Sequence, residues 1–210
     1  MITPLSPAPA LIAIVRGLRP DEAEAIGAAV LAGGFSAIEV PLNSPDPFAS
    51  IAILRRTLPA EHPVGAGTVL HPDQVHQARQ AGADFIVSPN VSRPVIEATR
   101  ALGMASLPGA ATPTEAFAAL DAGATMLKLF PAAALGPASL SAWRAVLPAG
   151  TPVLPVGGVS VQNLEQWHRA GAAGVGIGGE LFHPGDDPAS VGERAAAFAH
   201  RWAELSAPAG

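Results

Sequence analysis

The chain contains no cysteine. A disulfide framework, a thiolate metal site and a cysteine nucleophile are therefore excluded. Charged residues are also scarce, at 14% of the chain, whereas hydrophobic residues make up 49%. This composition is typical of a compact enzyme core, or of a protein that buries further surface in an oligomer, and it argues against disorder.

Positive charge is the rarer sign in this chain. There are 12 lysine and arginine residues against 17 aspartate and glutamate residues, which gives a net charge of -5. The arginines are scattered along the sequence, so no basic patch is available for a polyanion and we expect no nucleic-acid partner. The first residues lack a basic n-region, and their apolar run is too short to cross a bilayer, so we expect a cytoplasmic protein without membrane association.

Histidine spacing gives no sign of a metal site. The 6 histidines form no HxH or HExxH pattern, and His71 and His76 are five residues apart, which places them on different faces of a helix. We therefore expect no bound metal.

A junction made of a helix end, a glycine and a short apolar run recurs along the chain. It reads LAGGFSAIEV at 31–40, QAGADFIVSP at 80–89, ALGMASLPG at 101–109, DAGATMLKLF at 121–130 and RAGAAGVGIG at 169–178. Glycine suits the left-handed position that ends a helix, and the apolar run that follows suits a buried strand. The recurrence predicts alternating strands and helices.

The expected strands are eight apolar runs, at 11–15, 35–40, 64–67, 85–87, 104–107, 126–130, 153–156 and 174–177. Among the helix starts, TPTE at 112–115 offers Thr112 as N-cap, Pro113 at the first helical position and Glu115 as the partner in a capping box. Residues 188–205 are expected to form a closing helix. The alternation predicts a single (β/α)8 TIM barrel in one domain, 1–210, although an open doubly wound sheet has similar local patterning.

The single lysine of the chain, Lys128, stands in an apolar run that should be a buried strand, GATMLKLFPA at 123–132. A lysine can extend its ammonium group out of such a site to water. If it stays inside, burial lowers the pKa of the amine from about 10.4 and makes the amine nucleophilic toward a ketone. This is the usual setting of a lysine that forms a Schiff base.

Glu39 is a carboxylate within another apolar strand, in AIEVPLNSP. An ion pair with Arg16 or Lys128 is one interpretation. The other is that a water-poor pocket raises the pKa of the carboxyl group toward neutrality, so that it can take up and return a proton.

Further polar residues and glycines follow the expected strands, where barrels carry their chemistry. Arg16 and Thr68 can be a solvated cation and part of a tight turn, or together they can bind a carboxylate. The glycine pairs Gly157–Gly158 and Gly178–Gly179 can simply permit turns. Because exposed backbone N–H groups form the standard phosphate site after the last two strands of such barrels, they also predict a phosphorylated substrate. Ser88 and Asn90 are further polar residues that follow an expected strand.

Eight segments carry a resemblance that covers nearly the whole chain: IVRG, GFSAIEVPLNSP, GAGTVL, IVSPN, PGAATPTEA, LKLFPA, VLPVGGV and GIGGELF. Together they resemble the small class I aldolases that cleave 2-keto-3-deoxy-6-phospho sugar acids, the Entner-Doudoroff aldolase family. The resemblance implies pyruvate and glyceraldehyde 3-phosphate as products, no cofactor, and a homotrimer. The roles it implies are Schiff-base formation by Lys128, proton transfer by Glu39, carboxylate binding by Arg16 and Thr68, phosphate binding by the two glycine pairs, and pocket walls formed by Pro89 and Phe130.

Two positions bear on the configuration of the substrate at C4. Gluconate-type members of the family have arginine where Asn43 stands and threonine where Val156 stands, so the chain resembles the galactonate type. This implies 2-dehydro-3-deoxy-6-phospho-D-galactonate as substrate. The family usually has a serine where Gly179 stands, which leaves the dependence on the 6-phosphate open.

Three alternatives stay open at this point. One is an aldolase acting on 2-dehydro-3-deoxy-6-phosphogluconate or 4-hydroxy-2-oxoglutarate. The others belong to different classes, namely a metal-dependent sugar-phosphate epimerase and a barrel that binds phosphorylated ligands without catalysis.

Overall fold

Eight parallel strands form the centre of the structure, a computed structural model that describes residues 11–207. Neighbouring strands follow the order β7-β6-β5-β4-β3-β2-β1-β8, and a bridge between Val156 and Gly176 links the two ends of this order. The strands are β1 Leu11–Ile14, β2 Ala37–Pro41, β3 Val64–Gly67, β4 Phe85–Ser88, β5 Ala105–Ala110, β6 Leu127–Leu129, β7 Val153–Pro155 and β8 Val175–Ile177.

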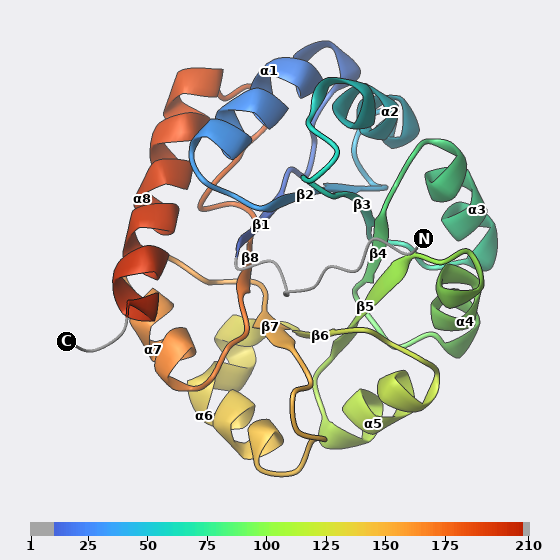
Figure 1. Cartoon of the computed structure of the whole chain (residues 1–210), viewed down its shortest axis with the longest axis vertical. Helices are drawn as coiled ribbons and strands as arrows, with labels where there is room; N and C mark the ends of the chain where they lie inside the picture. The colour runs from blue at the N-terminus through green and yellow to red at the C-terminus, as the bar shows by residue number, and fades with distance from the viewer. Residues whose placement is uncertain (1–10, 208–210) are drawn as a thin grey trace.

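The helices form a ring outside the strands, and α8 returns beside α1 (Figure 1). They are α1 Pro20–Ala32, α2 Pro47–Thr57, α3 Pro72–Gln80, α4 Arg93–Ala101, α5 Pro113–Asp121, α6 Ala132–Arg144, α7 Leu164–Arg169 and α8 Pro188–Ser206. This arrangement confirms the (β/α)8 TIM barrel and not the open doubly wound sheet. Residues 1–10 and 208–210, on which the targeting argument and the ends of the predicted domain rest, lie outside the described residues. None of the helices within 11–207 combines the length and apolar character needed to cross a membrane.

The repeated glycine junctions behave as the sequence predicts. Gly34, Gly82, Gly103, Gly123 and Gly171 all follow a helix and have φ between 73° and 97°. A side chain would be strained in this region, so glycine is needed where each helix turns into the next strand.

The predicted capping box at the start of α5 is also present. The Glu115 backbone N–H donates to Thr112 Oγ1 at 3.3 Å, and the Thr112 N–H donates to Glu115 Oε2 at 2.9 Å. The two residues therefore satisfy backbone donors that the first helical turn leaves open.

Strand β5 is longer than expected. The apolar run ends at Leu107, and the Pro108–Gly109 pair that follows resembles a turn, yet Gly109 and Ala110 pair with Lys128 and Leu129 of β6. Gly109 is needed for a second reason, since a Cβ atom there would lie 2.5 Å from the backbone oxygen of Pro89. The extension fixes the neighbours of Lys128.

Apolar side chains fill the space between strands and helices, and a smaller cluster fills the barrel interior. Ala37 of β2 and Met126, which precedes β6, belong to the interior cluster. Because side chains alternate along a strand, Glu39 and Lys128, two residues further on, face the same interior. The strand pattern thus places the Glu39 carboxyl group and the Lys128 amine in the layer of side chains next to the apolar interior cluster.

An ion pair between Arg55 and Asp84 connects elements at the end of the barrel where β3 and β4 begin. Asp84 Oδ2 accepts hydrogen bonds from Arg55 Nη1 at 2.9 Å and from the Val64 backbone N–H at 3.0 Å. Arg55 also donates to the backbone oxygens of His62, Leu58 and Pro59. These bonds join the end of α2 to the starts of β3 and β4.

We expect Asp84→Ala to lower the free energy of unfolding by about 1–3 kcal/mol, because it leaves a charged group and a strand N–H without their partner. Urea denaturation monitored by circular dichroism measures the change. Asp121→Ala, at an exposed helix end, is the matched control and should have little effect. An Asp84 variant as stable as this control would contradict the assigned role.

Candidate active site

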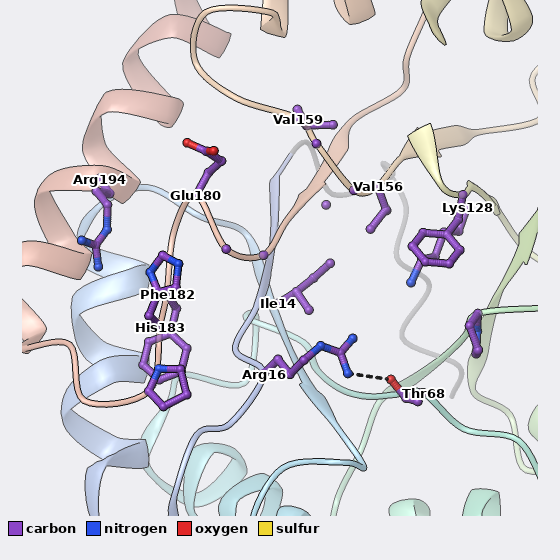
Figure 2. Close-up of a pocket in the computed structure, with 18 residues that line it drawn as sticks. Ile14, Arg16, Thr68, Lys128, Val156, Val159, Glu180, Phe182, His183 and Arg194 are labelled. Atoms are coloured by element: carbon purple, nitrogen blue, oxygen red, sulfur yellow. Dashed lines mark hydrogen bonds between the residues drawn. The ribbon is translucent and has the colours of Figure 1, made fainter. Parts of the chain in front are cut away.

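A cavity of about 760 Å³ opens at the end of the barrel where the strands terminate. Its lining comes from both the strand ends and the loops that follow (Figure 2). The lining residues are Ile14, Arg16, Thr68, Pro89, Lys128, Phe130, Val156, Gly157, Gly158, Val159, Gly176, Gly178, Gly179, Glu180, Phe182, His183, Pro184 and Arg194. We call this space the main cavity.

Lys128 lies at the inner wall of the main cavity and is only 6% exposed. Its Nζ is 4.8 Å from the centre of the Phe130 ring. Burial lowers the pKa of the Lys128 amine, the positive charge of Arg16 lowers it further, and Glu39 opposes both. A larger fraction of the amine is therefore neutral and able to attack a carbonyl carbon.

Glu39 is 2% exposed and faces a small void beneath the main cavity, which Lys128 also lines. Burial raises the pKa of the Glu39 carboxyl group, against the opposing charges of Lys128 and Arg16. Among the residues described, its carboxylate forms neither a hydrogen bond nor an ion pair. The ion pair of Glu39 with Arg16 or Lys128 is thus not found. The Glu39 carboxylate lines the same void as Lys128 without a hydrogen-bond partner among residues 11–207.

Space for the Glu39 side chain depends on a glycine in the neighbouring strand. A Cβ atom at Gly67 would lie 1.7 Å from Glu39 Oε1. The second glycine of GAGT therefore does more than form a turn, since any side chain at Gly67 would displace the carboxylate. Nothing in the local sequence indicates this pairing.

Arg16 and Thr68 lie together at the mouth of the barrel, joined by a 3.5 Å hydrogen bond from Arg16 Nη1 to Thr68 Oγ1 (Figure 2). The same nitrogen donates to Asn43 Oδ1. Thr68 has φ of 57°, which is unusual for a β-branched residue. With Nη1 held by two oxygens, the rest of the guanidinium fork is left for an anion such as a carboxylate.

The other predicted residues divide into two groups. Pro89, Phe130, Val156 and both glycine pairs line the main cavity. Asn43 does not line it and reaches the site only through Arg16. Ser88 donates its hydroxyl to the Val69 backbone oxygen at 2.8 Å, a structural bond, and Asn90 is also absent from the lining.

The residues at the outer end of the main cavity were not predicted from the sequence. Glu180, Phe182, His183, Pro184 and Arg194 line it, all from the segment after β8 and from α8. Histidine spacing tests only for metal sites, and the GIGG motif indicates only its backbone N–H groups, so neither pattern points to these side chains. Within 11–207, no three histidine, aspartate or glutamate side chains are grouped so that they could hold a metal ion.

Burying an amine should cost stability. The pKa of Lys128 is lowered in the folded protein, so the unfolded chain binds the proton more tightly and stability rises with pH up to the ordinary lysine pKa. We expect Lys128→Met to raise the free energy of unfolding at neutral pH by about 1 kcal/mol, as is common where a functional group is removed from a buried site.

The gain should become smaller as the pH rises toward 10, because the neutral amine costs less to bury. Thermal unfolding from pH 6 to pH 10 measures this difference. An Lys128→Met variant less stable than the parent throughout this range would contradict the assignment of a destabilising buried amine.

The fold and the site define a TIM-barrel protein with a buried amine suited to imine chemistry on a small carbonyl compound. The family model described as KDPG and KHG aldolase matches residues 5–189. The chain belongs to this aldolase family, whose reaction is that of a carbon–carbon lyase. This membership decides among the protein classes that the sequence left open.

Individual relatives agree with the family. The chain is 46% identical to the 2-dehydro-3-deoxy-6-phosphogalactonate aldolase of Escherichia coli strain K12, over 92% of this chain and 95% of the relative. It is 48% identical to the probable 2-dehydro-3-deoxy-6-phosphogalactonate aldolase of Rhizobium meliloti strain 1021, over 89% of this chain and 88% of the relative. A solved structure described as native KDPGal superposes with a TM-score of 0.91 and 46% identity, covering 93% of this chain and 95% of its own.

Proposed function

We propose that the protein is a class I aldolase that cleaves 2-dehydro-3-deoxy-6-phospho-D-galactonate to pyruvate and D-glyceraldehyde 3-phosphate. The observation that carries the proposal is the position of Lys128, an amine of lowered pKa at the wall of a cavity that can hold a sugar acid. The names of the two relatives support the substrate.

The first half of the reaction forms the imine. Neutral Lys128 attacks the C2 ketone, and loss of water from the carbinolamine gives a protonated Schiff base. This iminium draws electrons from the C3–C4 bond, so the proposed mechanism needs neither a metal nor another cofactor as electrophile. A low-polarity wall formed by Phe130 and Val156 favours the neutral amine that starts the sequence.

The second half of the reaction needs a group that first accepts and then donates a proton. Glu39, directly or through one water, removes the proton of the C4 hydroxyl, and the C3–C4 bond breaks to give the aldehyde and an enamine on Lys128. Glu39 then protonates C3 of the enamine, and hydrolysis releases pyruvate and the amine. The raised pKa of Glu39 suits both directions of transfer.

The two ends of the substrate are assigned by charge. Arg16 and Thr68 bind the C1 carboxylate, which the substrate and pyruvate share, while Asn43 holds the guanidinium in place. The backbone N–H groups of Gly157–Gly158 and Gly178–Gly179 bind the phosphate at the outer end.

The preference for one configuration of the substrate at C4 can be tested by a single comparison of the two epimers. Initial rates on the galactonate and gluconate epimers should favour the galactonate substrate by at least about tenfold in kcat/KM, since a misplaced hydroxyl leaves a hydrogen-bonding group unpaired at a cost of about 1–3 kcal/mol. A strong preference for the gluconate epimer would overturn both the substrate and the use of Asn43 and Val156 as its determinants.

We further propose a homotrimer that works in the cytoplasm. The large hydrophobic fraction of the chain, 49%, supports an oligomer, and the family resemblance supports three subunits. Light scattering coupled to gel filtration measures the subunit number.

A further inference from the structure

His183 lies at the outer end of the main cavity, away from the reacting amine. Figure 2 shows His183 and Lys128 on opposite sides of the cavity, with Arg16 between them in this view. In the proposed function the substrate phosphate lies at the glycine pairs, and Gly178–Gly179 directly precede the segment that carries His183. The inference below rests on the proposed function for this orientation.

The segment that carries His183 is held in place from two sides. Asp186 Oδ2 accepts a hydrogen bond from the His183 backbone N–H at 2.8 Å and pairs with the Arg194 guanidinium. Arg194 Nε donates to the Leu181 backbone oxygen at 2.8 Å. On the other side, Pro184 packs so closely on Gly17 that a Cβ atom at Gly17 would lie 2.5 Å from the Pro184 ring.

The imidazole ring of His183 is oriented between a carboxylate and a glycine loop. Its Nδ1 is 3.7 Å from Asp186 Oδ2. Its Nε2 is 3.7 Å from the position that a Cβ atom on Gly179 would occupy. One ring nitrogen therefore faces Asp186, and the other stands beside the backbone of the proposed phosphate loop. In the imidazolium form both nitrogens donate, so Nε2–H can bind an anion there while Nδ1–H faces the carboxylate.

Two charged side chains, Arg194 and Glu180, line this end of the cavity together with His183. Of the three, His183 is the one that can bind an anion. Arg194 also lines the cavity, but its charge is paired with Asp186. Glu180 lines the same end and is exposed, and in Figure 2 its carboxylate points away from Arg16 and Lys128. Glu180 should weaken anion binding here, whereas His183 should strengthen it.

We propose that His183 binds the terminal phosphate of the substrate through Nε2 and takes the place of the hydroxyl that position 179 lacks. The site is specific for a phosphomonoester dianion, because the histidine donor acts together with the backbone N–H groups of Gly178 and Gly179. His183 is thus a binding residue that selects phosphorylated over plain substrates, and it takes no part in imine chemistry.

The test compares two aldehydes in the condensation direction, D-glyceraldehyde 3-phosphate and D-glyceraldehyde, each with pyruvate. His183→Ala should lower kcat/KM for the phosphorylated aldehyde by about 10- to 100-fold, the usual range for one hydrogen bond to a charged group. It should leave kcat/KM for D-glyceraldehyde unchanged. His200→Ala is the matched control, since His200 on α8 is also exposed and has a carboxylate neighbour, Glu204, at 3.1 Å.

A second variant makes the result specific to position 179. The backbone at Gly179 lies outside the left-handed region, and a Cβ atom there meets only His183 Nε2, at an ordinary contact distance of 3.7 Å. Gly179→Ser should therefore fit, and in the His183→Ala background it should restore most of the lost kcat/KM for the phosphorylated aldehyde. Glu180→Gln should raise kcat/KM for the phosphorylated aldehyde, the opposite of the effect of His183→Ala. It should also lower the inhibition constant of inorganic phosphate.

Equal losses on both aldehydes, or no loss on either, would overturn the assignment of His183. Calorimetric titration with inorganic phosphate separates this failure from a failure of the proposed function, because it needs no turnover. If the parent protein does not form an imine with pyruvate, the aldolase mechanism fails, yet weaker phosphate binding by His183→Ala would still support the site. If the imine forms and phosphate binding is the same in both proteins, the inference about His183 alone is wrong.

Discussion

Borohydride reduction in the presence of pyruvate should convert the imine to a secondary amine and so attach one pyruvate-derived 1-carboxyethyl group to the protein, on the peptide that contains Lys128. The chain has no other lysine, so intact mass followed by peptide mapping gives an unambiguous result. Label on another peptide, or no label, would contradict the proposed mechanism.

Lys128→Arg should abolish the label and lower turnover by a factor on the order of 10⁴ or more, as removal of a covalent nucleophile does in other enzymes. The guanidinium keeps the positive charge but cannot supply a neutral amine. A variant that retained appreciable activity would show that the cavity works by electrostatic attraction alone. Circular dichroism on the variant distinguishes lost chemistry from lost folding.

Glu39→Gln should lower kcat by about 10²–10⁴, the usual contribution of one general acid–base group. The variant should still form the reduced pyruvate adduct at Lys128, because the amide keeps the shape of the side chain and the lysine is unchanged. Glu97→Gln, at an exposed position on α4 that pairs with Arg93, is the control and should keep the parent rate.

Two other results for Glu39→Gln would contradict its assignment as the group that transfers the proton. Loss of the adduct together with turnover would mean that the carboxylate is needed to form the imine. An unchanged kcat would mean that another group moves the proton, and Glu39 would then be only a buried acid near the site. Single-turnover measurements of adduct formation and of aldehyde release resolve the steps.

Much of the fold followed from local patterns in the sequence. Helix ends, glycines and short apolar runs act over a few residues, so the junctions at Gly34, Gly82 and Gly123 predicted the strands that follow them. Strand β5 was the exception, because Pro108 and Gly109 resemble a turn when read alone. They continue the strand since β6 pairs with Gly109 and Ala110, and such pairing depends on residues distant in sequence.

The central pair of the candidate site was also visible in the sequence. A lone lysine and a glutamate in apolar strands are costly to bury, so each needs a reason to be there. The structure agrees with the burial of Lys128 and Glu39 and with the directions of the pKa shifts that burial causes. Their roles as Schiff-base lysine and proton carrier stay predictions that the two experiments above test.

Local sequence determined the barrel, the buried amine and the acid, because hydrophobic periodicity, glycine turns and the cost of burying charge all act within a short stretch of chain. Only the tertiary structure decided which side chains complete the cavity. Gly67 makes room for Glu39, Asn43 holds Arg16 without reaching the cavity, and His183 stands beside Gly179. The first two contacts join residues of neighbouring strands or their loops, so closure of the barrel sets their distances. The third depends on how the loop after β8 is folded.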